Sequence, residues 1–291
     1  MKKRNQTKKL LCLLIALLPI MFAAIVPISA ESKSIITPVS VVLDGTFILD
    51  SSTGEGALLI DAVTYVPLRR FCSIFGGEVS WDNSSRTAHV RSVGLDISVP
   101  SEKQYILVND RAFFCPSGII IIDGTLYVPV RVLAKAFGLE VEWRTSNDVS
   151  IGYVNLTSGL GRAESASDVY DEEVLYWLSR IISAESRGES LMGQIAVGNV
   201  VLNRTRSDNF PDTVYDVIFD TKFGVQFTPA ASGTIYEEPT QSSIIAAKIC
   251  LEGYTLSDDI LYFLNEAIST NLWVSNNRKY IMTVGNHTFY S

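Results

Sequence analysis

Histidine and cysteine are scarce in this sequence, and their scarcity excludes several kinds of site. The 291 residues include 2 histidines, His89 and His287, which argues against zinc peptidases and amidases built on two or three histidine ligands. The 4 cysteines are irregularly spaced and form no disulfide framework. A Cys72–Cys115 disulfide is compatible with an oxidising compartment, but burial as small hydrophobic side chains is the commoner role for these two residues and for Cys250. We therefore expect no metal site and no cofactor.

Basic residues are also in short supply once the amino terminus is set aside. Residues 1–30 combine five lysines and arginines with an apolar run and end in Ile-Ser-Ala, which is the three-part pattern of a cleaved signal peptide. An uncleaved membrane anchor is the alternative, because the apolar run is near the lower length limit for a span. Without this segment, 19 of the 24 basic residues remain against 31 acidic ones, a net charge of −12. We expect a secreted, extracytoplasmic protein with no stable membrane association and no nucleic-acid partner, since such a partner requires a basic surface.

A repeat occupies the first half of the chain that follows. Residues 64–81 recur as residues 126–143 at a constant offset of 62, and each copy contains Tyr-Val-Pro, an arginine two residues later, Phe-Gly and a closing tryptophan. Proline is tolerated in the first turn of a helix, and glycine favours the position just after its end. Each copy therefore predicts a strand, a helix that ends near Gly76 or Gly138, and a second strand. The fold expected for residues 31–154 is an α+β pseudo-repeat.

These motifs resemble the copper amine oxidase N-terminal-like domain, a stalk module of exported proteins. With His89 as its one histidine, the region offers no plausible copper site. Tyr65, Arg69 and Trp81 are better explained as core and turn residues than as ligands. The resemblance implies that this module spaces or attaches the rest of the protein at the cell wall.

Residues 155–170 are rich in Ser, Gly and Ala and are predicted to be a linker to a domain spanning residues 171–291. Ser167 or Asp168 is expected to cap its first helix, in which apolar residues recur at helical spacing up to Ile182. Glu185 continues this apolar stripe, so its carboxyl group is predicted to be partly desolvated, with a raised pKa. Such a carboxyl can serve as a general acid, although a structural ion pair with Arg187 or Arg204 is the alternative.

The following segments also predict helices. Residues 194–204 are apolar around most of the helix circumference, so this helix should be buried, and its polar residues Gln194, Asn199 and Asn203 need partners in the protein or in a ligand. Short helices are expected at residues 214–219 and at 244–252, the second after a Thr240 cap.

The order of motifs resembles the spore cortex-lytic enzyme family, the SleB-like cell-wall hydrolases. The resemblance rests on Ala-Glu-Ser-Arg-Gly-Glu at residues 184–189, on residues 193–204, on Phe-Pro at 210–211 and on Gln-Phe at 226–227. Leu-Tyr-Phe at residues 261–263 and the closing Gly-Asn-His-Thr-Phe-Tyr at 285–290 complete it. It implies a mainly α, lysozyme-like domain that acts as a lytic transglycosylase on peptidoglycan, with Glu185 as its catalytic acid. Departures from the family pattern at residues 228–240 and 263–267 affect the expected preference for sugars.

The resemblance also implies a set of substrate-binding residues: Arg187, Glu189, Gln194, Asn203, Gln226, Phe227, Phe263, Asn265, His287 and Tyr290. Aromatic members, together with Tyr262, are expected to stack on sugar faces, and the amides to bind N-acetyl groups. A core or capping role is the alternative for each.

Three other functions stay open on the sequence alone. A muramidase requires a second carboxylate, for which the candidates are Asp208, Asp212, Asp216 and Asp220. A Cys–His amidase would use Cys250 and His287, but Cys250 lies in an apolar helical pattern typical of inert thiols. A wall-binding adaptor without turnover is the third. The expected partner is peptidoglycan of the cell wall or spore cortex, bound by a monomer.

Overall fold

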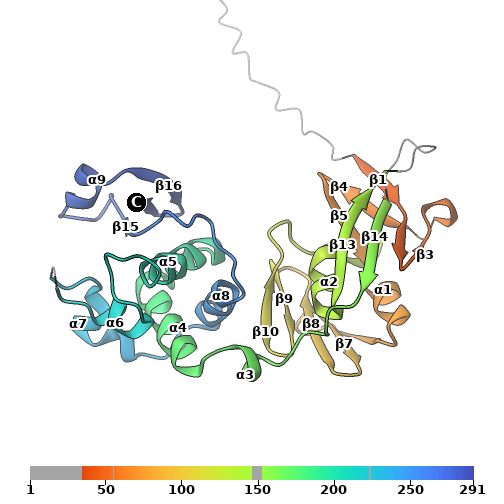
Figure 1. The fold of residues 1–291 in the computed structure, drawn as a ribbon, viewed down its shortest axis with the longest axis horizontal. Helices are drawn as coiled ribbons and strands as arrows, with labels where there is room; N and C mark the ends of the chain where they lie inside the picture. The colour runs from red at the N-terminus through yellow and green to blue at the C-terminus, as the bar shows by residue number, and fades with distance from the viewer. Residues whose placement is uncertain (1–34, 55, 146–152, 223) are drawn as a thin grey trace, which may run out of the picture. The chain divides into compact units, whose positions relative to one another are not determined.

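The structure is a computed structural model that describes residues 35–54, 56–145, 153–222 and 224–291. The signal segment predicted at residues 1–30 lies outside these ranges. Ile35–Ser291 form one compact unit, in which an amino-terminal module (residues 35–158) precedes a carboxy-terminal module (residues 159–291) along the chain (Figure 1). Among the described residues, no helix is both long and apolar enough to cross a membrane.

Three antiparallel or mixed sheets and two helices make up the described part of the amino-terminal module. The sheets have the orders β1-β4-β5-β12-β11, β10-β9-β8-β7-β6 and β13-β14-β2-β3. The bounds are β1 Ile36–Val39, β2 Val41–Leu43, β3 Thr46–Leu49, β4 Ala57–Ile60, β5 Val63–Pro67, α1 Leu68–Ile74, β6 Glu78–Asp82, β7 Thr87–Ser92, β8 Leu95–Pro100, β9 Tyr105–Val108, β10 Arg111–Phe114, β11 Ile120–Ile122, β12 Thr125–Pro129, α2 Val130–Phe137, β13 Leu139–Arg144 and β14 Tyr153–Ser158.

The sequence repeat is a structural repeat. Strand β5, helix α1 and strand β6 recur as β12, α2 and β13 at the same offset of 62 residues. The two copies meet where β5 pairs antiparallel with β12, and the central pair joins Val66 to Val128, which are themselves repeat partners. Equivalent residues facing each other across an antiparallel pair relate the copies by an approximate two-fold axis. The predicted pseudo-repeat is thus confirmed for these elements.

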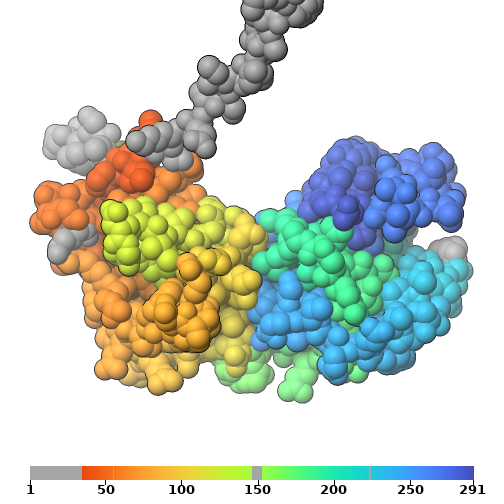
Figure 2. Space-filling view, turned by 180° about the vertical axis from the view of Figure 1, so that it is seen from behind, coloured from red at the N-terminus to blue at the C-terminus, as the bar shows by residue number. Residues whose placement is uncertain are grey.

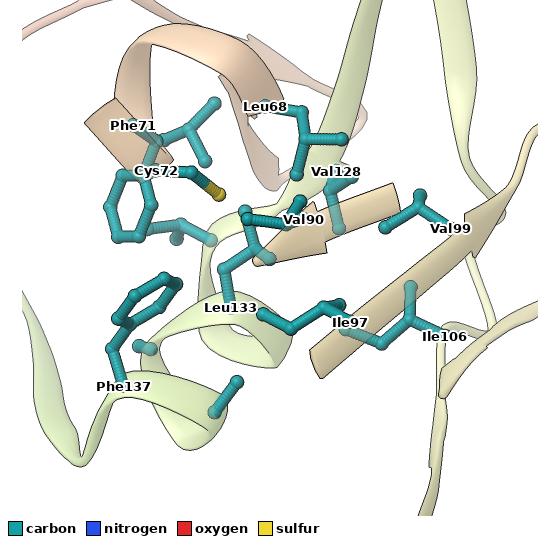
Figure 3. Packing of buried hydrophobic residues seen from close by; sticks show 14 of the residues in the cluster. Leu68, Phe71, Cys72, Val90, Ile97, Val99, Ile106, Val128, Leu133 and Phe137 are labelled. Atoms are coloured by element: carbon teal, nitrogen blue, oxygen red, sulfur yellow. The ribbon is translucent and has the colours of Figure 1, made fainter. Parts of the chain in front are cut away.

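A glycine in the left-handed conformation follows each helix, but in the first copy the cap residue of α1 is Phe75 and Gly76 (φ 71°) comes one position later. Helix α2 has Gly138 at its carboxy-terminal cap, in the left-handed conformation with φ 69°. A Cβ there would also collide with the backbone oxygen of Leu160. The two helices bury their apolar faces against strands β7, β8 and β9, and Figure 3 shows Phe71 and Cys72 from α1 together with Leu133 and Phe137 from α2 in this core.

The polar and aromatic residues that the two copies of the repeat share hold the fold rather than a ligand. Arg69 donates to the backbone oxygen of Val79 (2.8 Å), and its repeat partner Arg131 donates to the equivalent oxygen of Val141 (3.2 Å). Tyr65 is buried and donates to the backbone oxygen of Ser117 (2.9 Å). The exception is Trp81, whose exposed fraction is 43%, so it is not a core residue.

The predicted linker begins later than the sequence suggests. Residues up to Ser158 belong to β14, which pairs antiparallel with β13 and parallel with β2. Hydrogen bonds from two neighbouring strands therefore extend the module past residue 154, the boundary predicted from composition. Residues 166–169 form a short helix, α3.

The carboxy-terminal module is mainly helical, with one small sheet of order β15-β17-β16. In Figure 1 this sheet and α9 lie on one side of α5, and α4, α6 and α7 lie on the other. The bounds are α3 Ala166–Val169, α4 Glu172–Ser186, α5 Leu191–Arg204, α6 Val214–Phe219, α7 Thr228–Ser232, α8 Gln241–Leu251, β15 Tyr262–Leu264, α9 Trp273–Asn277, β16 Tyr280–Val284 and β17 His287–Tyr290.

Side-chain caps set the helix starts. Asp171, rather than Ser167 or Asp168, caps α4 by accepting from the backbone N–H groups of Glu173 and Val174. Ser165 caps α3, which ends before α4 begins. The helix expected at residues 214–219 is confirmed, and α8 begins directly after its Thr240 cap, three residues earlier than expected.

Helix α5 is the centre of this module, and it is buried from Gly193 to Arg204. It packs on α4 and α8, and Gly198 lies where the three helices approach most closely. A Cβ on Gly198 would lie 2.8 Å from the Cys250 Sγ and 2.8 Å from the Ile182 Cδ1. Glycine at this position therefore permits the close approach of the three helices.

A cluster of charged side chains surrounds Glu252, at the end of α8. Its carboxylate accepts from Arg111 (2.7 and 2.9 Å), Lys135 (2.6 Å) and the Tyr170 hydroxyl (2.7 Å). Burial alone would raise the pKa of Glu252, but these hydrogen bonds outweigh it, so the pKa lies below its usual value. The ionised carboxylate thus ties residues of both modules together.

Candidate functional site

Helix α4 positions Glu185 in its last turn. Leu178, Ile181 and Ile182 are fully buried, and Glu185 follows them at helical spacing on the same face. The side chain reaches a cavity of about 1030 Å³ in the carboxy-terminal module. The sequence prediction of an inward-facing carboxyl is confirmed in its geometry.

The cavity is formed by α4, α5, the segment after α6, β15 and α9. Figure 2 shows a hollow between the blue lobe of the last strands and the cyan lobe of α6 and α7. Lining residues with a charged, aromatic or amide side chain include Glu185, Arg204, Asp208, Phe210, Asp220, Gln226, Phe227, Tyr262, Phe263, Trp273 and Arg278.

Burial gives Glu185 an unusual proton affinity. Desolvation raises the pKa of its carboxyl to about 7, and the nearby charge of Arg204 opposes that rise. Within the described residues, no side chain or backbone group hydrogen-bonds the carboxyl. A structural ion pair with Arg187 is excluded, because Arg187 is bound to Glu237 (2.9 Å). Glu185 is therefore a carboxyl that can hold a proton near neutral pH.

Arg204 is the cation of this cavity. Its Nε donates to the backbone oxygen of Leu261 (2.8 Å), and its guanidinium lies over the rings of Phe210, Phe227 and Tyr262 at 4.8, 5.0 and 5.4 Å. Burial lowers its pKa to about 10, and the charges of Tyr262, Asp220 and Glu185 counteract that effect. Sequence reasoning named Arg204 as a possible structural partner of Glu185 but did not place it among the substrate-binding residues.

Of the ten residues predicted to bind substrate, Gln226, Phe227 and Phe263 line the cavity. The Gln226 Nε2 donates to the backbone oxygen of Gly224 (3.1 Å). Phe227 is buried beside Arg204, and Phe263 packs edge-on against His287 with ring centres 5.3 Å apart.

Gln194 and Asn203 find their partners within the protein. Gln194 donates to the backbone oxygen of Glu189 (3.0 Å) and accepts from the Ser243 hydroxyl (2.9 Å). Asn203 donates to the backbone oxygens of Ser257 (2.9 Å) and Ile260 (3.0 Å). These buried amides hold neighbouring segments, and neither is among the residues that line the cavity.

Glu189 and His287 also lie away from the cavity lining. Glu189 accepts from the backbone N–H (3.1 Å) and the side-chain amide (2.7 Å) of Asn286. The hydrogen bond from the Asn286 side chain is the main cause that lowers the pKa of Glu189. Burial lowers the pKa of His287, so this ring is neutral at pH 7. Through its two hydrogen bonds with Asn286, Glu189 fixes the turn between β16 and β17.

The other three predicted binding residues likewise make internal contacts. Arg187 is paired with Glu237, Asn265 accepts from the backbone N–H of Ala267 (3.1 Å), and Tyr290 donates to Glu266. Burial, followed by the hydrogen bond to Glu266, raises the pKa of the Tyr290 hydroxyl to about 12. Their positions favour structural roles.

Tyr262 was expected to stack on sugar faces, whereas no sequence motif pointed to Arg278, which also lines the cavity. Its guanidinium lies 4.4 Å from the Tyr262 ring centre and 5.3 Å from that of Trp273. An exposed arginine in a polar segment has no sequence pattern that predicts such a stack.

The structure separates the four aspartates considered as a second carboxylate. Asp208 and Asp220 line the cavity with Glu185. Asp216 instead accepts from Thr213 (2.6 Å), its helix cap, and Asp212 is exposed outside the lining.

The three cysteines that the structure describes are buried, unpaired thiols. Cys72, Cys115 and Cys250 are free and buried, so no Cys72–Cys115 disulfide forms. Burial raises the pKa of the Cys250 thiol far above its usual value, and the thiol points at the backbone oxygen of Ile195 (3.4 Å). A thiol of this kind is a poor nucleophile, which argues against the Cys–His amidase.

The amino-terminal module offers neither a catalytic acid nor a copper site in its described residues. A smaller cavity of about 450 Å³ lies there between β5, β12 and β13 and is mostly apolar, with Trp143 at its edge. His89 contacts the Ser98 hydroxyl (3.1 Å), and nowhere in the described ranges do three potential metal ligands gather. The donor set does not fit copper.

A helical module whose cavity holds a protonatable carboxyl and aromatic rings is the arrangement of a glycan-cleaving domain, and comparison with known proteins agrees with that class. Residues 188–290 match the family described as Cell Wall Hydrolase, and residues 51–151 match the Copper amine oxidase N-terminal domain. The chain thus carries a cell wall hydrolase domain after a copper amine oxidase N-terminal domain. The match to the first family begins three residues after Glu185.

Individual relatives support the same assignment. The chain is 34% identical over 120 residues to the spore cortex-lytic enzyme of Bacillus cereus, covering 41% of this chain and 45% of that protein. It is 35% identical over 112 residues to the spore cortex-lytic enzyme of Bacillus subtilis, covering 38% of this chain and 35% of that protein. The chain therefore spans less than half the length of these relatives.

A solved structure is similar over the same region. The catalytic domain of germination-specific lytic transglycosylase SleB from Bacillus anthracis is 34% identical, with 42% of this chain and 97% of that chain covered and a TM-score of 0.39.

Proposed function

We propose that this protein cleaves the glycan strands of peptidoglycan as a lytic transglycosylase, with Glu185 acting first as acid and then as base. The observation that carries the proposal is the Glu185 carboxyl, which reaches a large cavity and is desolvated enough to raise its pKa to about 7. A general acid is most effective when its pKa lies near the working pH.

The reaction needs one carboxyl group. Glu185 gives its proton to the oxygen that bridges N-acetylmuramic acid and N-acetylglucosamine, and the bond from the muramyl C1 to that oxygen breaks, with the electron pair leaving on the oxygen. The Glu185 carboxylate then takes a proton from the C6 hydroxyl of the same muramyl sugar, and the C6 oxygen bonds to C1. The products are a 1,6-anhydro end and a free hydroxyl, and Glu185 regains its proton. Nucleophile and electrophile share one sugar, so proximity replaces a second catalytic group.

The cavity has the surfaces that a sugar polymer requires. Phe227, Phe263, Tyr262 and Trp273 present rings to it, and aromatic rings stack well on the apolar faces of sugars. Gln226 offers an amide for hydrogen bonds with N-acetyl groups.

The relatives' names suggest the setting of this activity. Spore cortex-lytic enzymes match the carboxy-terminal module, so we infer that its fold is lysozyme-like and that its partner is peptidoglycan of the spore cortex or cell wall. The protein then works outside the cytoplasm, as a monomer and without a cofactor. The amino-terminal module spaces or attaches the catalytic module at the wall.

Hydrolysis by a muramidase is the second candidate, because Asp208 and Asp220 share the cavity with Glu185. Either aspartate would have to activate a water molecule or bind the sugar across from the acid. The two reactions differ by one water in the mass of the product.

The test uses residues 31–291 with purified cortex and vegetative sacculi. Mass spectrometry of the released muropeptides should show anhydro ends. Ends that are heavier by one water would reject transglycosylation in favour of hydrolysis. Glu185→Gln should bind sacculi without releasing fragments, whereas the exposed Glu173→Gln on the same helix should behave like wild type. Wild-type protein that binds sacculi but releases nothing would instead indicate an adaptor.

A further inference from the structure

Arg204 is a buried cation for which the described part of the chain supplies no ion-pair partner. Its exposed fraction is 4%, and its Nη1 is buried with no hydrogen-bond partner among the described residues. The other buried arginine, Arg180, is paired with Glu238 at 3.1 Å. An unpaired guanidinium in a protein interior costs free energy, so its retention beside the cavity calls for an explanation in terms of function.

Aromatic rings fix the position of this cation. The guanidinium lies 4.8 to 5.4 Å from the ring centres of Phe210, Phe227 and Tyr262, and the Nε is held by the backbone oxygen of Leu261. Rings attract a cation through their negative faces and yet accept no strong hydrogen bond from it. Arg204 is thus held in place with part of its donor capacity unused.

Two acidic groups face Arg204. Glu185 approaches from α4, and Asp220 from the segment after α6, while the Tyr262 hydroxyl belongs to β15. The remaining charged groups on the cavity lining are Asp208, Lys222 and Arg278. Burial keeps Glu185 partly protonated at pH 7. A negative charge on Glu185 would therefore appear during turnover, next to a fixed cation.

We propose that Arg204 is a positioning residue for proton transfer, and that its guanidinium binds the carboxylate which Glu185 becomes after protonating the bridge oxygen. The inference rests on the proposed function. While the proton is on the leaving sugar, attraction to Arg204 lowers the energy of the Glu185 carboxylate. When the C6 hydroxyl returns a proton, the charge and the ion pair disappear together. Arg204 acts through Glu185 and touches no atom of the substrate.

The electrostatics of the free protein agree with this role. Burial raises the pKa of Glu185, and Arg204 is the one group that acts in the opposite direction on it. Without Arg204 the carboxyl would hold its proton to higher pH but would release it less readily to the substrate.

The test compares Arg204→Met, Arg204→Lys and Arg180→Gln in the 31–291 protein. Methionine keeps apolar contacts with the three rings but has no charge. The readout is the initial rate of anhydro-muropeptide release from sacculi between pH 5 and pH 9. Wild-type activity should fall as the pH rises through about 7, because Glu185 loses the proton that it must donate. In Arg204→Met this alkaline limb should move up by about one pH unit, and the maximal rate should fall about tenfold or more.

The two other variants separate charge from structure. Arg204→Lys should return the limb toward the wild-type position. Arg180→Gln, which removes a buried arginine that is also stacked on a ring (Tyr176, 3.8 Å) but does not line the cavity, should leave the limb unmoved. A folded Arg204→Met with its limb at the wild-type pH would overturn the proposal.

A direct measurement keeps the proposal testable even where Arg204→Met does not fold. In the wild-type protein, the side-chain carbon and nitrogen resonances of Arg204 should shift with the same midpoint as the Glu185 carboxyl carbon, assigned by its loss in Glu185→Gln. Independent midpoints would reject the pairing. If Glu185→Gln is inactive and the alkaline limb of Arg204→Met stays at the wild-type pH, only the role of Arg204 is rejected. If Glu185→Gln is active, the proposed function itself is rejected.

Discussion

The raised proton affinity of Glu185 should make the active protein less stable than its inactive variant in alkaline solution. A carboxyl whose pKa is raised on folding is held in its neutral form by the native state. Ionising it in the folded protein therefore costs free energy, and that cost grows as the pH rises from the unfolded pKa toward the folded one. For Glu185 these limits are 4.5 and about 7.

The magnitude follows from those two values. Between them the penalty grows by about 1.4 kcal/mol per pH unit, which gives about 3 kcal/mol at pH 7 and above, and less than about 1 kcal/mol at pH 5. The same change raises the protonated fraction at pH 7 from about 0.3% to about half, or roughly 150-fold. The burial that supplies the general acid is thus the burial that lowers the stability.

Glu185→Gln removes the titration and keeps the shape of the side chain. We expect its free energy of unfolding in urea, measured by circular dichroism, to exceed that of wild type by about 3 kcal/mol at pH 8. At pH 4.5 the two proteins should differ by a few tenths of a kcal/mol at most from this cause. Lysis of sacculi by the variant should fall by about 10² to 10⁴, the usual contribution of a general acid.

The comparison across pH is the decisive part of this experiment. Glu173→Gln controls for the loss of a negative charge from α4, since Glu173 is exposed in the first turn. If the stability difference between wild type and Glu185→Gln were the same at pH 4.5 and pH 8, Glu185 would titrate normally and the argument for a buried acid would fail.

Three further outcomes follow from the described contacts. Glu252→Gln should lower the free energy of unfolding by about 2 to 4 kcal/mol at pH 7, because it leaves Arg111 without its carboxylate. Since folding lowers the pKa of Glu252, the stability difference between the variant and wild type should shrink as acid protonates the wild-type carboxylate. Equal urea midpoints of the two proteins at pH 7 would contradict this prediction. Gly198→Val should abolish the native near-ultraviolet circular dichroism through its clash with Cys250, whereas Gly161→Ala, with open space around it, should not. Cys250 should stay unmodified by iodoacetamide in the native protein, and mass spectrometry that finds it alkylated before unfolding would show that the thiol is accessible.

Local patterns predicted much of the secondary structure correctly. The sequence repeat with its offset of 62 could be read directly. The helix starts were predictable because α2 after Pro129 and α6 after Thr213 begin through contacts within a few residues. The predicted linker boundary failed for the opposite reason. Strand β14 is held by β2, more than a hundred residues earlier in the sequence, and composition does not reveal such a partner.

The candidate site divides in the same way. Helical periodicity alone placed Glu185 on the buried face of α4, because the spacing of apolar residues sets which face packs inward. Polarity in a buried helix showed that Gln194 and Asn203 need partners, but not whether these belong to the protein or to a ligand. The structure gives them backbone and side-chain partners within the module.

What the sequence by itself determined is the order of the modules, the repeat and the position of one acid on one helix face. Tertiary structure alone decided what surrounds that acid. Arg204, Asp220 and Trp273 come from separate segments, and they line one cavity with Glu185 because the packing of α4, α5 and α9 brings them there. Proton affinity depends on desolvation and on charges a few ångströms away, and both are properties of that assembled cavity rather than of any stretch of chain.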